Sequence, residues 1–218
     1  MEGLAFVPPR EPFLLVANHF QAPHLWVGWV AAAITAAVAS AREPGGRNLH
    51  WVILSEWRWF AVGNLWVPNP LSSLIFPRAA RCWELILMPS RPSDVAGRAE
   101  ALRQALAYLG HGRAAQPLSP EPVGLFPEGR ASVALEEARP GTGRFLYRAS
   151  SLGVPLLPVG VHLEGDVLVV RFGRLFSLSG PAPADLDGWA REQVMASVGR
   201  LLPREMWGVY ADAIQETL

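Results

Sequence analysis

The feature that most constrains the fold is an apolar segment that ends in a histidine and is followed by a long uncharged segment. Residues 13–17 are apolar and predict a buried strand, which ends at Asn18 and His19. Residues 25–41 carry no charge, and Pro23 fits the first turn of a helix, where its missing N–H would be unpaired in any case. We therefore expect a buried helix after the strand, with His24 in its first turn, rather than a membrane span.

Further strands and helices alternate along the rest of the chain. Apolar runs predict strands at 50–54, 84–88, 123–126, 155–162 and 166–172, and periodic or capped segments predict helices at 94–109, 141–151, 185–202 and 203–218. This alternation predicts an α/β fold: a largely parallel mixed sheet flanked by helices, with its functional site at the strand ends. At 218 residues, the chain fits one domain over residues 1–218, with core motifs in 14–162 and closing helices in 185–218.

Composition excludes some functions. The chain has 19 basic and 19 acidic residues, so no overall positive charge favours nucleic acid. Cys82 is the one cysteine, so no intrachain disulfide can form, and residues 1–10 lack the features of a signal peptide. We expect a cytoplasmic protein. The tryptophan-rich segment 55–70, with Trp57 and Trp66, fits either a membrane contact or ordinary core packing.

Two motifs carry candidate chemistry. His19 stands at a strand-to-helix junction, and an imidazole can take a proton from a hydroxyl near neutral pH, although a lone histidine is more often structural. Glu128, Gly129 and Arg130 follow a strand directly, and a carboxylate, a flexible glycine and a guanidinium are suited to bind a phosphorylated ligand.

Together with Arg91 and the apolar residues 154–161, these motifs resemble the glycerolipid acyltransferase superfamily, in particular the bacterial lysophosphatidic acid acyltransferases. Residues 14–162 carry the resemblance. Asn18-His19 is similar to the start of the His-x4-Asp motif, whose His is the general base, and residues 87–91 resemble the second motif. Residues 124–132 are similar to Phe-Pro-Glu-Gly-Thr-Arg-Ser without its Thr, and residues 155–161 resemble the fourth motif.

The resemblance implies an acyltransferase that moves a fatty acyl group from acyl-CoA or acyl carrier protein to the hydroxyl of a lysophospholipid or a related phosphorylated acceptor. His19 would be the general base, and no metal or cofactor is implied. The implied substrate-binding residues are Asn18, Arg91, Glu128, Gly129 and Arg130. A lipid acceptor implies peripheral attachment to the inner face of the cell membrane.

His24 stands where the family has its Asp. We expect a neutral His24 to accept a hydrogen bond from His19 and to make it a weaker base than the Asp would. Two alternatives remain open: a catalytically impaired relative that binds lipids, and a metal-dependent hydrolase that uses His19, His24 and Glu128 or His162. The residues do not identify the acceptor.

Overall fold

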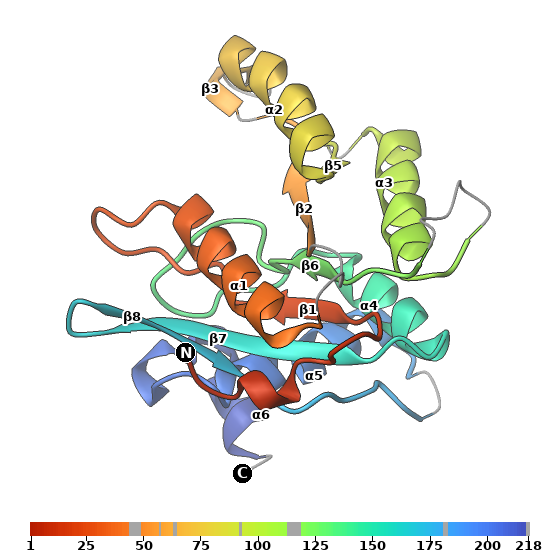
Figure 1. Ribbon diagram of the computed structural model, residues 1–218. Helices are drawn as coiled ribbons and strands as arrows, with labels where there is room; N and C mark the ends of the chain where they lie inside the picture. Colours follow the sequence, from red (N-terminus) through yellow and green to blue (C-terminus); the bar gives the residue numbers. More distant parts are fainter. Residues whose placement is uncertain are drawn as a thin grey trace.

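Six strands form one sheet in the computed structural model, which describes residues 1–43, 49–56, 58–62, 65–91, 93–112, 119–180 and 183–216. Their order across the sheet is β5-β2-β6-β1-β7-β8 (Figure 1). Only β8 runs antiparallel to its neighbour, so the mixed, largely parallel sheet that the sequence predicts is confirmed. The strands are β1 (Leu14–Ala17), β2 (His50–Leu54), β5 (Ile86–Met88), β6 (Val123–Leu125), β7 (Leu156–Glu164) and β8 (Val167–Phe172).

The two central strands explain the apolar runs of the sequence. β1 lies between β6 and β7, with Val16 opposite Leu125 on one side and Pro158 on the other. All residues of β1 and β6 are buried. A strand covered by helices on both faces buries every side chain, so it appears in the sequence as a continuous apolar run.

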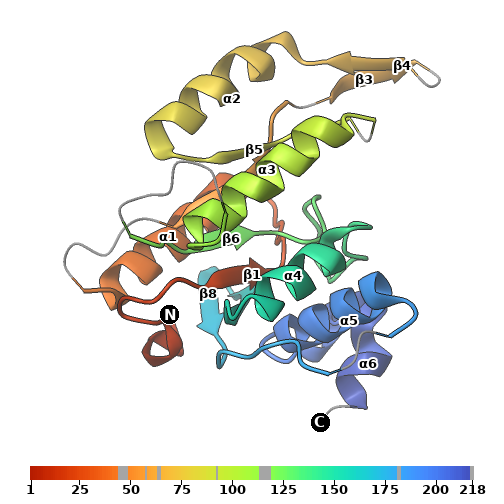
Figure 2. The same cartoon turned by 90° about the vertical axis from the view of Figure 1, so that its right-hand side faces the viewer.

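Helices cover both faces of the sheet. Figure 2 shows α1 on one side of β1, and α4 and α5 on the other. This arrangement follows from right-handed crossovers, because the chain moves from β1 towards the β5 edge through α1 and returns from β6 to β7 through α4. The helices of the layers are α1 (Val27–Ala41), α2 (Pro70–Trp83), α3 (Val95–Tyr108), α4 (Thr142–Ser151) and α5 (Leu186–Gly199).

One helix and one hairpin were not predicted. The Asn69 side chain accepts hydrogen bonds from Leu71 N and Ser72 N, and Pro70 is the first residue of α2. An asparagine cap followed by proline is a helix-start signal that we overlooked. Before α2, β3 (Arg58–Val62) and β4 (Leu65–Pro68) form a separate antiparallel hairpin.

The C-terminal segment differs from the predicted second helix. It forms two short 3-10 turns, η2 (Arg204–Met206) and η3 (Gly208–Tyr210), followed by α6 (Ala211–Gln215). Gly208 has a φ of 52°, and a Cβ there would lie 1.9 Å from the Leu135 carbonyl oxygen. The close approach of two backbones, rather than helical periodicity, therefore decides the structure here.

Two further observations complete the fold. After β8, Phe176 forms an antiparallel bridge with Leu156 of β7. Within the described residues, none of the helices combines the length and the apolar character needed to cross a membrane.

Candidate active site

The loops that follow β1 and β6 form the candidate site. Because these strands are parallel neighbours, His19 and Phe126 leave the same edge of the sheet, which we call the carboxyl edge. The backbone N–H of Ser132 donates to the His19 carbonyl at 2.9 Å, and the N–H of Gln21 donates to the Ser132 carbonyl at 2.9 Å. These bonds join residues 18–22 to residues 126–132, which together are the site loops.

Glu128 is buried between the two site loops. One carboxylate oxygen accepts the backbone N–H of His19 at 2.5 Å, and the other accepts the N–H of Glu136 at 2.9 Å. Burial raises the pKa of Glu128 to about 7, although these two N–H donors favour its charged form. Each oxygen accepts one backbone N–H, so Glu128 shapes the loop that carries His19. Its contact with a substrate stays a prediction.

His19 is a neutral imidazole at pH 7. Burial lowers its pKa to about 4, and a contact with the Arg130 backbone opposes this shift. Its ring stacks on Phe126, with centroids 4.7 Å apart and planes 13° from parallel. Its Nδ1 is buried and has no hydrogen-bond partner in the described structure. A neutral imidazole has one nitrogen that can accept a proton, as a general base requires.

His24 does not lie where the sequence analysis placed it. Helix α1 begins at Val27, and residues 22–25 form a tight turn in which the Leu25 N–H donates to the Ala22 carbonyl at 3.1 Å. His24 is exposed, with a φ of 64°. Pro followed by a left-handed residue is typical of the middle of a type II turn, so Pro23 begins a turn and not a helix.

The predicted hydrogen bond from His19 to His24 is therefore wrong for this structure. Nothing bonds to His19 Nδ1 within the described chain.

Asn18 joins two strands. Its side-chain nitrogen donates to the Val161 carbonyl at 2.9 Å, and its side-chain oxygen accepts the Val161 N–H at 2.7 Å. Asn18 is buried, so its amide links the end of β1 to β7. This pairing uses one of the two N–H donors and one of the two acceptor sites of the amide, and the predicted substrate contact of Asn18 stays a prediction.

The arginines lie in two places on the carboxyl edge. Arg130 follows Glu128 and forms an ion pair with Glu136, while most of its side chain is exposed. Arg91 follows β5, the outermost strand of the sheet, and its Nε lies 3.7 Å from a carboxylate oxygen of Glu56. It lines a separate cleft of about 490 Å³ beside the start of α3. The structure thus places Arg130 beside His19 and places Arg91 beyond β2.

The sequence analysis missed Arg139. Its guanidinium donates to the carbonyls of Glu128 and Gly129 at 3.3 and 3.4 Å. Gly129 has a φ of 63°, and a Cβ there would lie 2.8 Å from Arg139 Nε. Glycine is thus needed both for its conformation and for the close approach of Arg139. Nothing in the sequence spacing pointed to Arg139.

An apolar cavity lies next to the site loops. It has a volume of about 630 Å³ and is lined by residues 21–26 and Val133. Trp26 is 58% exposed and lies edge-on to Trp29, which is 63% exposed. The start of α1 therefore presents large apolar side chains directly after the histidine loop.

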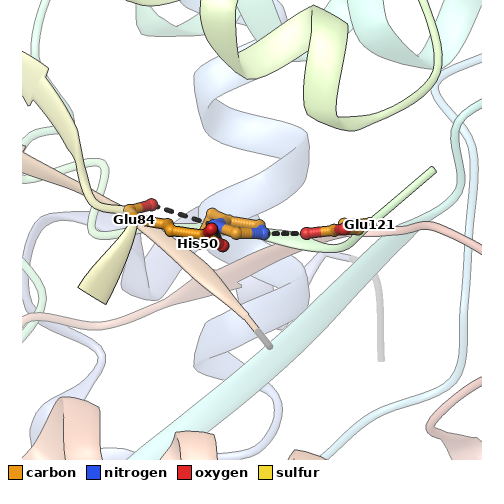
Figure 3. Close-up of side chains that lie close together, drawn as sticks. All are labelled: His50, Glu84 and Glu121. Atoms are coloured by element: carbon orange, nitrogen blue, oxygen red, sulfur yellow. Dashed lines mark hydrogen bonds and ion pairs between the residues drawn. The ribbon is translucent and has the colours of Figure 1, made fainter. Parts of the chain in front are cut away.

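A second histidine lies at the opposite edge of the sheet with two carboxylates, Glu84 and Glu121 (Figure 3). His50 Nδ1 donates to the Glu84 carbonyl at 2.9 Å, and Nε2 faces the Glu121 carboxylate directly. The Glu84 carboxylate lies 3.9 Å from Nδ1, whose proton already points at a carbonyl. Because the two glutamates do not share one free nitrogen, the cluster fits a buried hydrogen-bond network better than a metal site.

The predicted metal-dependent alternative gains no support. The group of possible ligands found in the described residues contains none of His19, His24, Glu128 and His162. His162 is buried, and its Nε2 lies 3.0 Å from a Glu164 carboxylate oxygen.

Comparisons with known proteins give a similarity among solved structures alone. No family model and no curated protein matches the sequence. Among solved structures, the chain is similar to the 1-acyl-sn-glycerophosphate (LPA) acyltransferase PlsC from Thermotoga maritima, with 17% sequence identity and a TM-score of 0.49. The similarity covers 92% of this chain and 70% of that protein.

Proposed function

We propose that the protein is an acyltransferase that moves a fatty acyl group from acyl-CoA or acyl carrier protein to the hydroxyl of a lysophospholipid or a related phosphorylated acceptor. The observation that carries the proposal is His19: a neutral imidazole on a loop that a buried glutamate holds, in contact with the backbone of Arg130, whose guanidinium is exposed. The motif resemblance described above supplies the reaction type.

The proposed reaction is direct transfer. His19 takes the proton of the acceptor hydroxyl while its oxygen attacks the thioester carbonyl, the carbon–sulfur bond breaks, and the proton passes to the leaving thiolate. A positioned base contributes about 10²–10⁴-fold to the rate. Because the pKa of His19 is lowered to about 4, the imidazole is unprotonated at neutral pH but has a weak affinity for the proton.

Arg130 is the proposed phosphate contact for the acceptor. Its guanidinium is exposed beside the site loops, and a phosphate can replace Glu136 as its partner with bidentate geometry. Arg91 is a second proposed contact for a larger headgroup, since its cleft lies further along the same edge. The apolar cavity beside residues 21–26 is the proposed site for the acyl chain.

A lipid acceptor leads us to propose peripheral attachment to the inner face of the cell membrane. The exposed apolar residues of the carboxyl edge support this: Trp26 and Trp29 at the start of α1, and Leu71, Leu74 and Ile75 in the first turns of α2. Our earlier candidate, residues 57–66, cannot be compared with them, because Trp57 and the side chain of Trp66 lie outside the described residues.

Vesicle binding tests this attachment. Replacing Trp26 and Trp29 by Ser should weaken sedimentation with anionic phospholipid vesicles. The matched control replaces Val167 and Val209, which are equally exposed but lie elsewhere in the fold, by Ser. Equal binding of both double variants would contradict the assignment of the contact to the start of α1.

Thiol release tests the reaction itself. Purified protein is mixed with a long-chain acyl-CoA, with and without lysophosphatidate, and His19→Ala is compared with the control His111→Ala, which changes a histidine beyond the end of α3. We expect release that depends on the acceptor and is lost only in His19→Ala. Release without acceptor would instead identify a thioesterase.

A lipid-binding relative without activity is the second candidate. It is favoured by the unpartnered Nδ1 of His19, because within the described part of the chain no acidic group bonds to this nitrogen to stabilise an imidazolium. Absence of thiol release with several donors and lysolipids, combined with retained vesicle binding, would support it.

A further inference from the structure

Three rings lie against one another next to the candidate base. His19 stacks on Phe126, and Phe126 stacks on Trp51 with centroids 4.7 Å apart and planes 12° from parallel. The rings come from three neighbouring positions in the sheet, since Trp51 lies in β2, Phe126 follows β6 and His19 follows β1. We call these three residues the ring stack.

The far end of the ring stack is fixed. Trp51 Nε1 donates to the Thr35 hydroxyl at 2.9 Å, and that hydroxyl donates to the Ala31 carbonyl at 2.8 Å. Trp51 also lies opposite Gly124 in the sheet, where a Cβ would come within 3.0 Å of the indole ring. A glycine on β6 and a hydroxyl on α1 thus define the position of Trp51.

The His19 side chain has one restraint besides the ring stack, a hydrogen bond between its ring and the backbone of Arg130. Glu128 and Ser132 bind its backbone N–H and carbonyl, but these bonds leave the side-chain torsions free. In the described structure, no group bonds to Nδ1 of the ring. A single hydrogen bond leaves the ring free to rotate about the bond, so the stacked contact with Phe126 sets the plane of the imidazole.

We propose that Phe126, supported by Trp51, is a positioning residue that holds the His19 imidazole in the orientation needed for proton transfer. The inference rests on the proposed function of His19. In serine proteases an aspartate orients the histidine through a hydrogen bond. Here a stack of apolar rings performs the orientation and also removes the imidazole from water, which is consistent with its lowered pKa.

Phe126→Leu tests the proposal, because leucine keeps an apolar side chain but has no flat ring. The pKa of His19, followed by NMR in the resting protein and assigned with His19→Gln, should rise from about 4 towards 6.5. The value of kcat should fall by about 10–10²-fold while KM stays nearly constant, because orientation and not binding is lost.

Two comparison variants sharpen the experiment. Tyr108→Leu removes the ring that stacks on His50 at the opposite edge, and should change neither kcat nor the pKa of His19. Phe126→Tyr retains a flat ring and should restore both values. If Phe126→Leu does not fold, Gly124→Ala displaces Trp51 instead and should change both values in the same direction.

The outcomes separate this inference from the proposed function. A His19 pKa and a kcat that are unchanged in Phe126→Leu would overturn the positioning role. If the wild type releases no thiol, the proposed function fails, and the NMR titration still decides whether the stack controls the imidazole.

Discussion

The two edges of the sheet each hold a histidine, a glutamate and an aromatic ring, but the histidines are bonded in opposite ways. At the carboxyl edge, Glu128 binds backbone N–H groups and leaves the His19 imidazole without a bond at Nδ1. At the opposite edge, where the parallel strands begin, both nitrogens of His50 face oxygen atoms, and Glu121 contacts the ring directly. His19 stacks on Phe126 much as His50 stacks on Tyr108.

The difference indicates that the His19 imidazole is available for proton transfer, whereas the His50 imidazole stabilises the fold. A proton must lie between His50 Nε2 and Glu121, since Nδ1 already donates to a carbonyl. Both residues of that pair are fully buried. His19 has no such partner, and the glutamate beside it holds the loop instead of the ring. Burial of a His and a Glu together therefore does not identify a catalytic pair; the bonding of the ring does.

The largest expected effect comes from exchanging the two histidines for alanine. His19→Ala should lower kcat/KM by about 10²–10⁴-fold, because a base is lost. Its free energy of unfolding should fall by about 1–3 kcal/mol, because the ring leaves its stack with Phe126. His50→Ala should destabilise the fold more, because it also removes the buried contact with Glu121. Thiol-release assays and urea unfolding measure the two effects. Loss of activity in a fully folded His50→Ala variant would contradict a purely structural role for His50.

The next effect concerns the two glutamates. Glu121→Gln removes the charge from a buried pair and should lower the free energy of unfolding by about 3–5 kcal/mol. Glu128→Gln should cost about 1–3 kcal/mol, because the amide can still accept one of the two N–H groups. Urea unfolding at pH 7 compares the two variants. An equal loss in the free energy of unfolding would contradict the difference between the two glutamates.

The sequence predicted the strands well because buried parallel strands are continuous apolar runs. Residues 50–54 match β2, and residues 166–172 include all of β8. It also associated His19 with residues 126–130, which the adjacency of β1 and β6 brings together. The ring stack was beyond this reasoning, because it depends on the order β2-β6-β1 and on the register of Trp51 with Gly124. His24 was misplaced because Pro starts turns as readily as helices.

A smaller effect follows from the opposite pKa shifts of the site residues. The pKa of His19 is lowered from 6.5 to about 4, so its stabilising contribution is present above pH 6.5 and is lost as the pH falls through about 4. The pKa of Glu128 is raised from 4.5 to about 7, so its contribution is present below pH 4.5 and is lost as the pH rises through about 7. Between pH 4.5 and 6.5 the two contributions oppose each other.

Glu128→Gln should expose the His19 contribution. In this variant the free energy of unfolding should rise with pH between 4.5 and 6.5 more steeply than in the wild type, by up to about 1.4 kcal/mol per pH unit. Urea unfolding at several pH values measures the slope. Glu192→Gln, which changes an exposed carboxylate on α5, serves as the control and should leave the slope unchanged. A slope in Glu128→Gln equal to that of the wild type would contradict the raised pKa.

The smallest effect is expected at His24, which occupies the Asp position of the resembled motif. His24 is exposed in a turn, with a φ of 64°, and does not bond to the His19 ring. His24→Asp should therefore leave kcat within about twofold of the wild type, although a charge in the lining of the proposed acyl cavity should raise KM. The fold should persist because Asp tolerates left-handed conformations. A tenfold rise in rate, by about 1.4 kcal/mol of added transition-state stabilisation, would show that residue 24 reaches the imidazole during the reaction. In that case the ring stack would not be sufficient to orient His19, and the double variant His24→Asp with Phe126→Leu would recover the activity that Phe126→Leu loses.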